Sequence, residues 1–293
     1  MATKPGQYGI LVAVDGSPES DAAVRWAARE AVLRETPVTL MHVIAPAVVS
    51  WPVAAVEGSI TEWREDNARH VIEQAHKTLL ANIGDAESPA VRTEVKHAGI
   101  VPELLAAADE AQMVAVGSRG IGAVGRAILG SVSSGLIHHA PCPVAVVHAN
   151  EGQAPDYGSP VLLGIDGSPA SESATALAFD EASRRGAGLV ALHAWSDVAV
   201  FPVLGMDWHQ YEDEGGEVLG ERLAGWQEQY PDVNVQRRVV CDLPARWLIE
   251  ESRRAQLVIV GNRGRGGFAG MLLGSVSSAV ARSADAPVIV VRP

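Results

Sequence analysis

The sequence has few of the features that mark a secreted, membrane-spanning or disulfide-stabilised protein. Among 293 residues there are only two cysteines, Cys142 and Cys241, which predicts free thiols in a reducing compartment. No apolar run approaches the ~20 residues that cross a bilayer. The opening "MATKPGQYG" lacks the apolar stretch of a signal peptide. These absences predict a cytoplasmic protein with no membrane partner.

Basic residues are scarce as well. The formal net charge is -12, which argues against nonspecific binding to nucleic acid or to an anionic membrane surface. The chain has three lysines, at Lys4, Lys77 and Lys96, so its second half contains none. A P-loop needs a lysine after its glycines, and this excludes a P-loop from the second half.

The sequence does contain a tandem duplication. "GILVAVDGSPES" at 9–20 returns as "VLLGIDGSPASES" at 161–173, and "AQMVAVGSRG" at 111–120 returns as "AQLVIVGNRG" at 255–264. The matching segments keep the same order in both halves, as repeats of one structural unit do. We therefore expect two domains, 1–150 and 158–293, joined by the polar stretch "NEGQAPDYGS".

Each half alternates short apolar runs with longer segments of helical period. The apolar runs are continuous, as in strands that are buried on both faces of a parallel sheet. Ser17 and Pro18 are typical of a helix N-cap and first helical residue. The order βαβαβαβαβ in each half predicts the α/β class, with two tandem doubly wound parallel-sheet domains of the α/β/α sandwich type.

The last apolar run of each half, "VAVV" and "VIVV", is expected to end its sheet. An exposed apolar edge strand invites uncontrolled pairing. Pairing of the two last strands within a chain, or with a second chain in a homodimer, would remove that exposure.

Two strand ends carry candidate binding residues. The first strand ends at Asp15, with Asp166 as its counterpart, and the fourth ends at Gly117, with Gly261 as its counterpart. After Gly117 the chain takes about a dozen residues to reach the next helix, whereas such loops usually have ~2–6. Ligands of open α/β sheets bind at the carboxyl ends of strands where the strand order reverses.

The stretch "GSRGIGAVGRAILGSVSS" at 117–134 returns as "GNRGRGGFAGMLLGSVSS" at 261–278. Its glycines, which include Gly122 and Gly125, let backbone N–H groups approach a ligand, and the following helix start favours an anion. Arg119 adds a positive charge. The simpler alternative is a turn in which Ser131 or Ser133 only caps the helix, but the spacing in both copies favours a phosphate site.

One motif within this stretch is misleading. Residues 120–125, "GIGAVG", match the dinucleotide fingerprint in letters. That fingerprint belongs after the first strand and needs an acidic residue ~20 positions on, yet there is no Asp or Glu between Glu110 and Glu151. The sequence therefore argues against a Rossmann dehydrogenase.

The strand ending in Asp before "GS", combined with G-x2-G-x9-G-[ST], resembles the ATP-binding branch of the universal stress proteins, in the tandem form of mycobacteria. The resemblance covers essentially the whole chain. It implies a flavodoxin-like or adenine nucleotide α-hydrolase-like sheet, and ATP, with AMP or ADP as alternatives and with or without Mg²⁺, at the switch point. It also implies dimerisation through the last strand.

The resemblance further implies which residues bind the nucleotide. Asp15 and the backbone at Val43 would face the adenosine. The phosphates would be held by Gly117, Arg119, Gly120, Gly130, Ser131, Val132 and Ser133. The matching residues of the second half are Asp166, Ala194, Gly261, Arg263, Gly264, Gly274, Ser275, Val276 and Ser277. The halves differ at Val43 against Ala194, Ser118 against Asn262 and Arg126 against Gly270, so equal affinity does not follow.

Other residue types point to no further chemistry. His42 and His193 recur at strand ends without a partner at metal-ligand spacing, so no metal site is expected. Two apolar segments, 45–58, which contains Trp51, and 196–209, which follows Trp195, are interpreted as loops that either cover a bound base or pack in the ordinary way.

Efficient ATP hydrolysis needs a base or water-orienting group, which the glycine stretch lacks, and no catalytic residue is assigned. The leading hypothesis is an ATP-binding regulator in a stress response, with an unidentified protein partner. The alternatives are a slow ATP hydrolase and a nucleotide-free interaction scaffold.

Overall fold

The computed structural model describes residues 7–46, 54–84, 89–121, 129–149, 156–194, 208–241, 243–264 and 273–293, without the side chains of 54–60, 208–214 and 218. The chain divides into two compact units, Met1–Ala149 and Asn150–Pro293, here called domain 1 and domain 2. In the described ranges no helix combines the length and apolar character that a membrane span requires.

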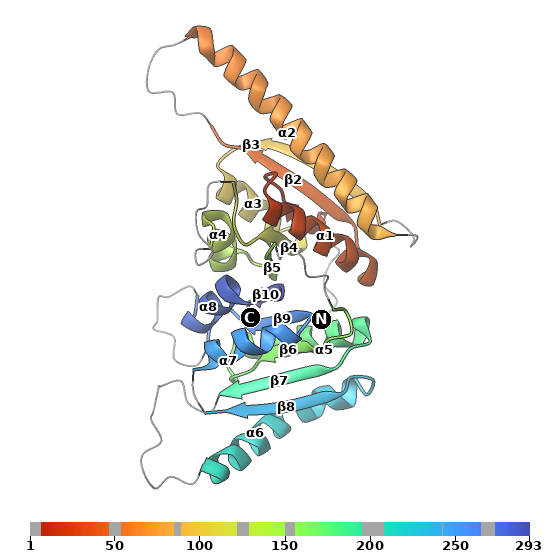
Figure 1. Cartoon of the computed structure of the whole chain (residues 1–293), viewed down its shortest axis with the longest axis vertical. Coiled ribbons are helices and arrows are strands. Elements are labelled where there is room, and N and C mark those ends of the chain that lie inside the picture. Colours follow the sequence, from red (N-terminus) through yellow and green to blue (C-terminus); the bar gives the residue numbers. More distant parts are fainter. Residues whose placement is uncertain are drawn as a thin grey trace. The chain divides into compact units, whose positions relative to one another are not determined.

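Both domains alternate strands and helices from start to end (Figure 1). Domain 1 consists of β1 (Gly9–Ala13), α1 (Pro18–Leu33), β2 (Val38–Ile44), α2 (Ala54–Ile83), β3 (Val91–His97), α3 (Ile100–Ala108), β4 (Ala111–Gly117), α4 (Ser131–His139) and β5 (Val144–Val147). Domain 2 consists of β6 (Val161–Gly164), α5 (Pro169–Arg185), β7 (Leu189–Ala194), α6 (Trp208–Gln229), β8 (Val235–Val240), α7 (Pro244–Glu251), a 3-10 turn (Ser252–Arg254), β9 (Leu257–Gly261), α8 (Ser275–Ser283) and β10 (Val288–Val291).

Each domain has a five-stranded sheet in which the paired strands are parallel. The order in domain 1 is β3-β2-β1-β4-β5, and in domain 2 it is β8-β7-β6-β9-β10. The strand order reverses between β1 and β4, and again between β6 and β9. The predicted α/β doubly wound fold is therefore confirmed, and the last strand of each domain ends that domain's strand order.

The continuous apolar runs form the centre of each sheet. Ile10, Leu11 and Val12 of β1 are fully buried, and residues 113–116 of β4 are buried with them. Helices α1 and α2 pack against each other over one face of the domain 1 sheet, while α3 and α4 pack together over the other (Figure 1). Burial on both faces explains why these strands are not alternately polar and apolar.

Local signals set the start of the first helix in each domain. Ser17 is the N-cap of α1 and its hydroxyl accepts a hydrogen bond from Ser20 N–H at 3.1 Å, while Pro18 is the first helical residue. Ser168 caps α5 in the same way through Ser171 N–H at 3.3 Å. Both caps hold the helix start beside the end of the preceding strand.

One predicted loop is helical. Residues 54–58, interpreted from the sequence as part of an apolar loop, form the start of α2, and residues 208–209 start α6. The segment "AAVEG" follows Pro52 and contains alanine and glutamate, which are good helix formers. Trp51 and Trp195 lie outside the described residues.

Candidate functional site

The carboxyl ends of two adjacent strands form the base of a site in each domain. Because β1 and β4 pair in parallel, Asp15 and the end of β4 lie at the same edge of the sheet. Ser17 N–H donates to Asp15 Oδ1 at 2.9 Å and Ile121 N–H donates to Asp15 Oδ2 at 3.2 Å. Asp15 thus fastens the loop that follows β4 to the end of β1.

Glycine is required where this loop passes the carboxylate. A β-carbon at Gly120 would lie 2.4 Å from Asp15 Oδ2, and one at Gly264 would lie 2.4 Å from Asp166 Oδ2. In domain 2, Ser168 N–H donates to Asp166 Oδ1 at 2.9 Å, as in domain 1. The motif aspartate and the second motif glycine are therefore in direct contact in both domains.

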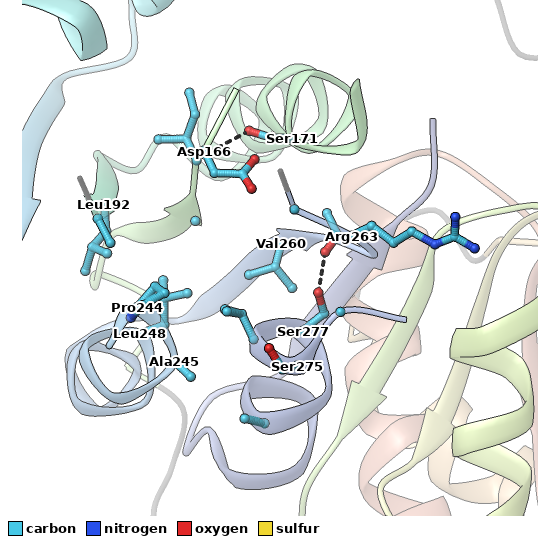
Figure 2. A pocket seen from close by; sticks show the side chains of 18 of the residues that line it. Asp166, Ser171, Leu192, Pro244, Ala245, Leu248, Val260, Arg263, Ser275 and Ser277 are labelled. Carbon is cyan, nitrogen blue, oxygen red and sulfur yellow. Dashed lines mark hydrogen bonds between the residues drawn. The ribbon is translucent and has the colours of Figure 1, made fainter. Parts of the chain in front are cut away.

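The far end of the loop is tied to its beginning. Gly130 N–H donates to the Ser118 carbonyl at 2.8 Å, and Ser133 Oγ donates to the Gly117 carbonyl at 2.7 Å. Domain 2 repeats both bonds, from Gly274 N–H to Asn262 at 2.7 Å and from Ser277 Oγ to Gly261 at 2.6 Å (Figure 2). These bonds bring the start of α4 or α8 against the end of the fourth strand.

This arrangement argues against the simpler alternative, in which Ser131 or Ser133 only caps the helix. The N-caps of α4 and α8 are Gly130 and Gly274, and neither helix has a side-chain cap hydrogen bond. The Ser133 hydroxyl donates its proton to a strand carbonyl, so it positions the helix rather than capping it.

The first turns of α4 and α8 keep backbone donors available. In the described part of the chain, the N–H groups of Ser131, Val132 and Ser133 have no acceptor, and neither have those of 275–277. Helix geometry leaves these donors unsatisfied, and together with the helix dipole they favour an anion. The predicted phosphate residues therefore supply three aligned donors in each domain.

Domain 2 has a cavity of about 650 Å³ at this position (Figure 2). A volume of this size falls within the ~300–1,000 Å³ of small-molecule sites. All nine residues predicted for the second site line it: Asp166, Ala194, Gly261, Arg263, Gly264, Gly274, Ser275, Val276 and Ser277. Asp166 and Ser171 lie on one side of the cavity, and Ser275 and Ser277 on α8 lie across from them (Figure 2).

An apolar wall, which the sequence analysis missed, completes the cavity. It comes from Leu192 on β7 and from the start of α7, where Leu243, Pro244 and Leu248 line the space. Leu243 is the N-cap of α7 and has a positive φ of 50°. Pro244 at the first helical position was a usable signal, because it marks a helix beginning just after a strand end. The wall offers an apolar surface opposite the polar loop.

The two predicted arginines are placed differently. Arg119 Nη2 lies 2.6 Å from Glu19 Oε1, so its charge is paired within domain 1. Arg263 lines the cavity of domain 2, but its side chain extends away from Ser275 and Asp166 (Figure 2). The positive charge that was predicted for the cradle is thus paired with Glu19 in domain 1, and the side chain that carries it in domain 2 is directed outward.

The remaining candidates divide into structural and undescribed residues. His42 Nδ1 lies 2.7 Å from the Val14 carbonyl and His193 Nδ1 lies 2.8 Å from the Ile165 carbonyl, so both rings bond to a neighbouring strand. Val43 is buried at the corresponding end of β2. No group of three metal-binding side chains occurs within the described residues. Outside them lie Gly122, Gly125, Arg126 and Gly270.

Fold and site together define a protein of two tandem doubly wound domains, each with a glycine-rich loop and a helix start at its switch point. The universal stress protein family model matches residues 9–148 and 159–292. A universal stress protein of Mycolicibacterium smegmatis is 58% identical over 293 residues, which cover 100% of both chains. One from Mycobacterium tuberculosis is 50% identical, covering 100% of this chain and 99% of its own.

A solved structure supports the same fold. The crystal structure of a universal stress protein from Archaeoglobus fulgidus superposes with a TM-score of 0.72 at 19% identity, covering 97% of this chain and 98% of the other. The chain belongs to the universal stress protein family.

Proposed function

We propose that this protein is an ATP-binding regulator with one adenine-nucleotide site in each domain. The observation that carries the proposal is the set of three unsatisfied N–H groups at the start of α8, which face a cavity of about 650 Å³. Aligned backbone donors at a helix start are a recurrent solution for binding phosphate.

The described residues fit such a ligand at both of its ends. The phosphates would be held by the N–H groups of residues 275–277 and by the loop at Gly264, where a side chain would collide with Asp166. The adenosine would lie against Leu192, Ala194 and Leu248. AMP and ADP would use the same contacts in part, and Mg²⁺ would be bound chiefly through phosphate oxygens.

A regulatory role follows if the nucleotide binds one conformation of the loop better than another, because a ligand shifts an equilibrium only through such a difference. This proposal includes a role in the response to stress and an unidentified protein partner. It also includes pairing through β5 and β10, either within a chain or in a homodimer. A cytoplasmic location belongs to it as well, and is supported by the low cysteine content of the chain, two residues in 293. Light scattering of the purified chain tests the homodimer directly.

Substitution of the N-cap glycines tests the sites separately. Backbone angles at Gly274 are φ -74° and ψ 154°, and an added β-carbon would approach other atoms no closer than 3.4 Å. Gly274→Asp therefore fits, favours the helix as an N-cap, and places a carboxylate where the phosphates would bind. Gly274→Asn is the matched neutral control. Gly130→Asp and Gly130→Asn form the corresponding pair in domain 1, with a nearest contact of 3.3 Å.

The measurement is calorimetric titration of the nucleotide-free protein with Mg-ATP, after acid release and chromatography of any co-purified nucleotide. We expect two sites per chain, with Gly274→Asp and Gly130→Asp each weakening one of them roughly a hundredfold and the asparagine variants weakening it far less. If the unsubstituted protein releases no nucleotide and binds no Mg-ATP, the proposal fails and an interaction scaffold replaces it. Steady phosphate release that depends on both sites would add a hydrolase activity.

A further inference from the structure

The two domains differ in charge at a position beside the cradle. Glu19 lies in the first turn of α1, and the repeat places Ala170 at the same point of α5. The Glu19 carboxylate pairs with Arg119 at 2.6 Å, and the two side chains are only 13% and 21% exposed. Screening by water and salt is weaker for a pair that is largely buried than for one on the surface. The cradle arginine of domain 1 is therefore neutralised by its own domain.

Domain 2 has no such carboxylate. Ala170 has no charge to offer, and in the described part of the chain Arg263 makes no ion pair or hydrogen bond through its side chain. The packing of the two residues is nevertheless the same in both domains. Ala170 packs against Gly261 as Glu19 packs against Gly117. The difference between the two sites is thus one of charge, on the same backbone.

A second cation strengthens the contrast. Burial, together with the nearby charge of Arg263, lowers the pKa of Arg292. The Arg292 Nε and Nη2 atoms are buried without a hydrogen-bond partner among the described residues. His148 occupies the corresponding position of domain 1. Arg263 and Arg292 therefore lie close together beside the domain 2 cradle, and within the described ranges neither side chain forms an ion pair.

A third position also adds positive charge to domain 2 but not to domain 1. Arg246, at the start of α7, lines the domain 2 cavity, and the repeat places the uncharged Pro102 at that position of domain 1. At these three matched positions domain 2 has Arg263, Arg292 and Arg246, whereas domain 1 has Arg119, which is already paired, His148 and Pro102. A cluster of one sign raises the local concentration and affinity of ions of the opposite sign.

We propose that Glu19 and Ala170 set the charge preference of the two nucleotide sites. Domain 2 selects the triphosphate over the monophosphate, whereas domain 1 discriminates weakly, because a triphosphate there must displace Glu19 from Arg119. This inference rests on the proposed function. It gives the fused protein one site that responds to ATP and a second site that adenine nucleotides occupy irrespective of phosphate number.

The physical step is an exchange of ion-pair partners. For Arg119 to bind a phosphate oxygen, its bond to Glu19 must break, and the released carboxylate then lies near the ligand's negative charge. Repulsion grows with each added phosphate, so the penalty falls mainly on ATP. Among the described residues of domain 2, these arginines have no ion-pair partner to give up.

Titrations of isolated sites measure the preference. The Gly274→Asp background leaves domain 1 to be measured, and the Gly130→Asp background leaves domain 2. Each is titrated with AMP, ADP and ATP at constant free Mg²⁺ by calorimetry. We expect the ratio of the AMP to the ATP dissociation constant to be at least about tenfold larger for domain 2, the factor for roughly one charge-assisted hydrogen bond.

Exchanging the two residues tests the cause. Glu19→Ala should tighten ATP binding by domain 1 about tenfold and change AMP binding much less, and Ala170→Glu should do the reverse in domain 2. Glu19→Gln, which keeps the length of the side chain, should behave like Glu19→Ala. Asp21→Ala is the matched control, because Asp21 is also in the first turn of α1 but pairs with Arg25. Thermal unfolding verifies that each variant is folded.

The outcomes separate the two proposals. If both isolated sites bind nucleotide with equal AMP to ATP ratios, or if Glu19→Ala and Glu19→Gln leave ATP affinity within twofold of the parent, the charge preference is wrong while the nucleotide sites remain. A misfolded Ala170→Glu leaves the Glu19 variants to decide. If neither isolated site nor the unsubstituted chain binds any adenine nucleotide, both proposals fail.

Discussion

Replacing Gly117 by alanine should destabilise domain 1, because the end of β4 touches the backbone of α1. A β-carbon at Gly117 would lie 2.6 Å from the carbonyl carbon of Glu19 and 2.8 Å from the nitrogen of Ser20. Ordinary contact begins near 3.4 Å, so the two backbones would have to separate by roughly 0.8 Å. Backbone atoms cannot rotate out of the way as a side chain can.

The helix has little freedom to make that movement. Its N-terminus is fixed by the Ser17 cap, and its own residues Ala22, Ala23 and Ala27 are buried against the rest of the domain. Overpacking of this kind typically costs ~1–3 kcal/mol. For a domain of this size each kcal/mol corresponds to about 2–4 °C in the unfolding midpoint, so Gly117→Ala should lower that of domain 1 by about 5 °C.

Scanning calorimetry of the full chain checks this expectation. Gly225→Ala is the control, because Gly225 lies in α6 with nothing within 4 Å of an added β-carbon. Alanine is favoured over glycine inside a helix by ~0.5–1 kcal/mol, so this variant should raise the midpoint of domain 2. A Gly117→Ala protein that unfolds at or above the unsubstituted midpoint, beside a Gly225→Ala control that behaves as expected, would refute the close-contact argument.

Further expectations concern a thiol and a buried ion pair. Burial raises the pKa of the Cys142 thiol to about 12, so at pH 8 its thiolate should be about a thousandfold scarcer than that of an ordinary cysteine, and a thiol reagent should modify it only after denaturation. Rapid modification of the native protein at Cys142 would contradict this burial. Arg185 and Glu181 form an ion pair at 2.9 Å with side chains 3% and 0% exposed, so Arg185→Ala should cost about 3 kcal/mol in urea unfolding. Arg184→Ala, which breaks the more exposed pair with Asp180, should cost less than about 1 kcal/mol, and equal losses for the two variants would show that burial is not the cause.

The fold could be predicted because its signals are local or periodic. Continuous apolar runs such as 113–116, the Ser17 cap with Pro18 after it, and the repetition of every segment each specify an element without knowledge of its neighbours. Once the elements alternate, few topologies remain, and a switch point next to the first strand follows. The site's polar side was predictable for the same reason, since Gly261 ends β9 and Asp166 follows the end of the adjacent strand β6.

The apolar side of the site could not be predicted from those signals. Leu192, Leu243 and Leu248 are unremarkable in the sequence, and only the crossover of α7 back over the sheet brings Leu243 and Leu248 to the cavity. The partner of Arg119 was missed for a related reason. Glu19 lies 100 residues earlier in the chain, and an acidic residue in the first turn of a helix is already favourable through the helix dipole, so nothing in the sequence links it to Arg119.

The duplication also shows how a cavity wall can change without loss of packing. Gly135 on α4 faces Val101 on α3, and a β-carbon at Gly135 would lie 2.8 Å from Val101 Cγ1. The repeat places Ala279 and Ala245 at these positions in domain 2, and both line its cavity. At these two positions domain 1 has a valine on α3, with three side-chain carbons, and a glycine on α4, with none. Domain 2 has an alanine, with one side-chain carbon, at each position.

That exchange predicts a strong energetic coupling between Val101 and Gly135. Gly135→Ala alone should cost ~1–3 kcal/mol through the clash with the valine. In the Val101→Ala background the clash is absent, and the same change should instead stabilise α4 by ~0.5–1 kcal/mol through helix propensity. A double-mutant cycle in urea measures the coupling, and additive single and double variants would contradict it. Domain 2 can therefore hold Ala279 because the position that matches Val101 is the smaller Ala245.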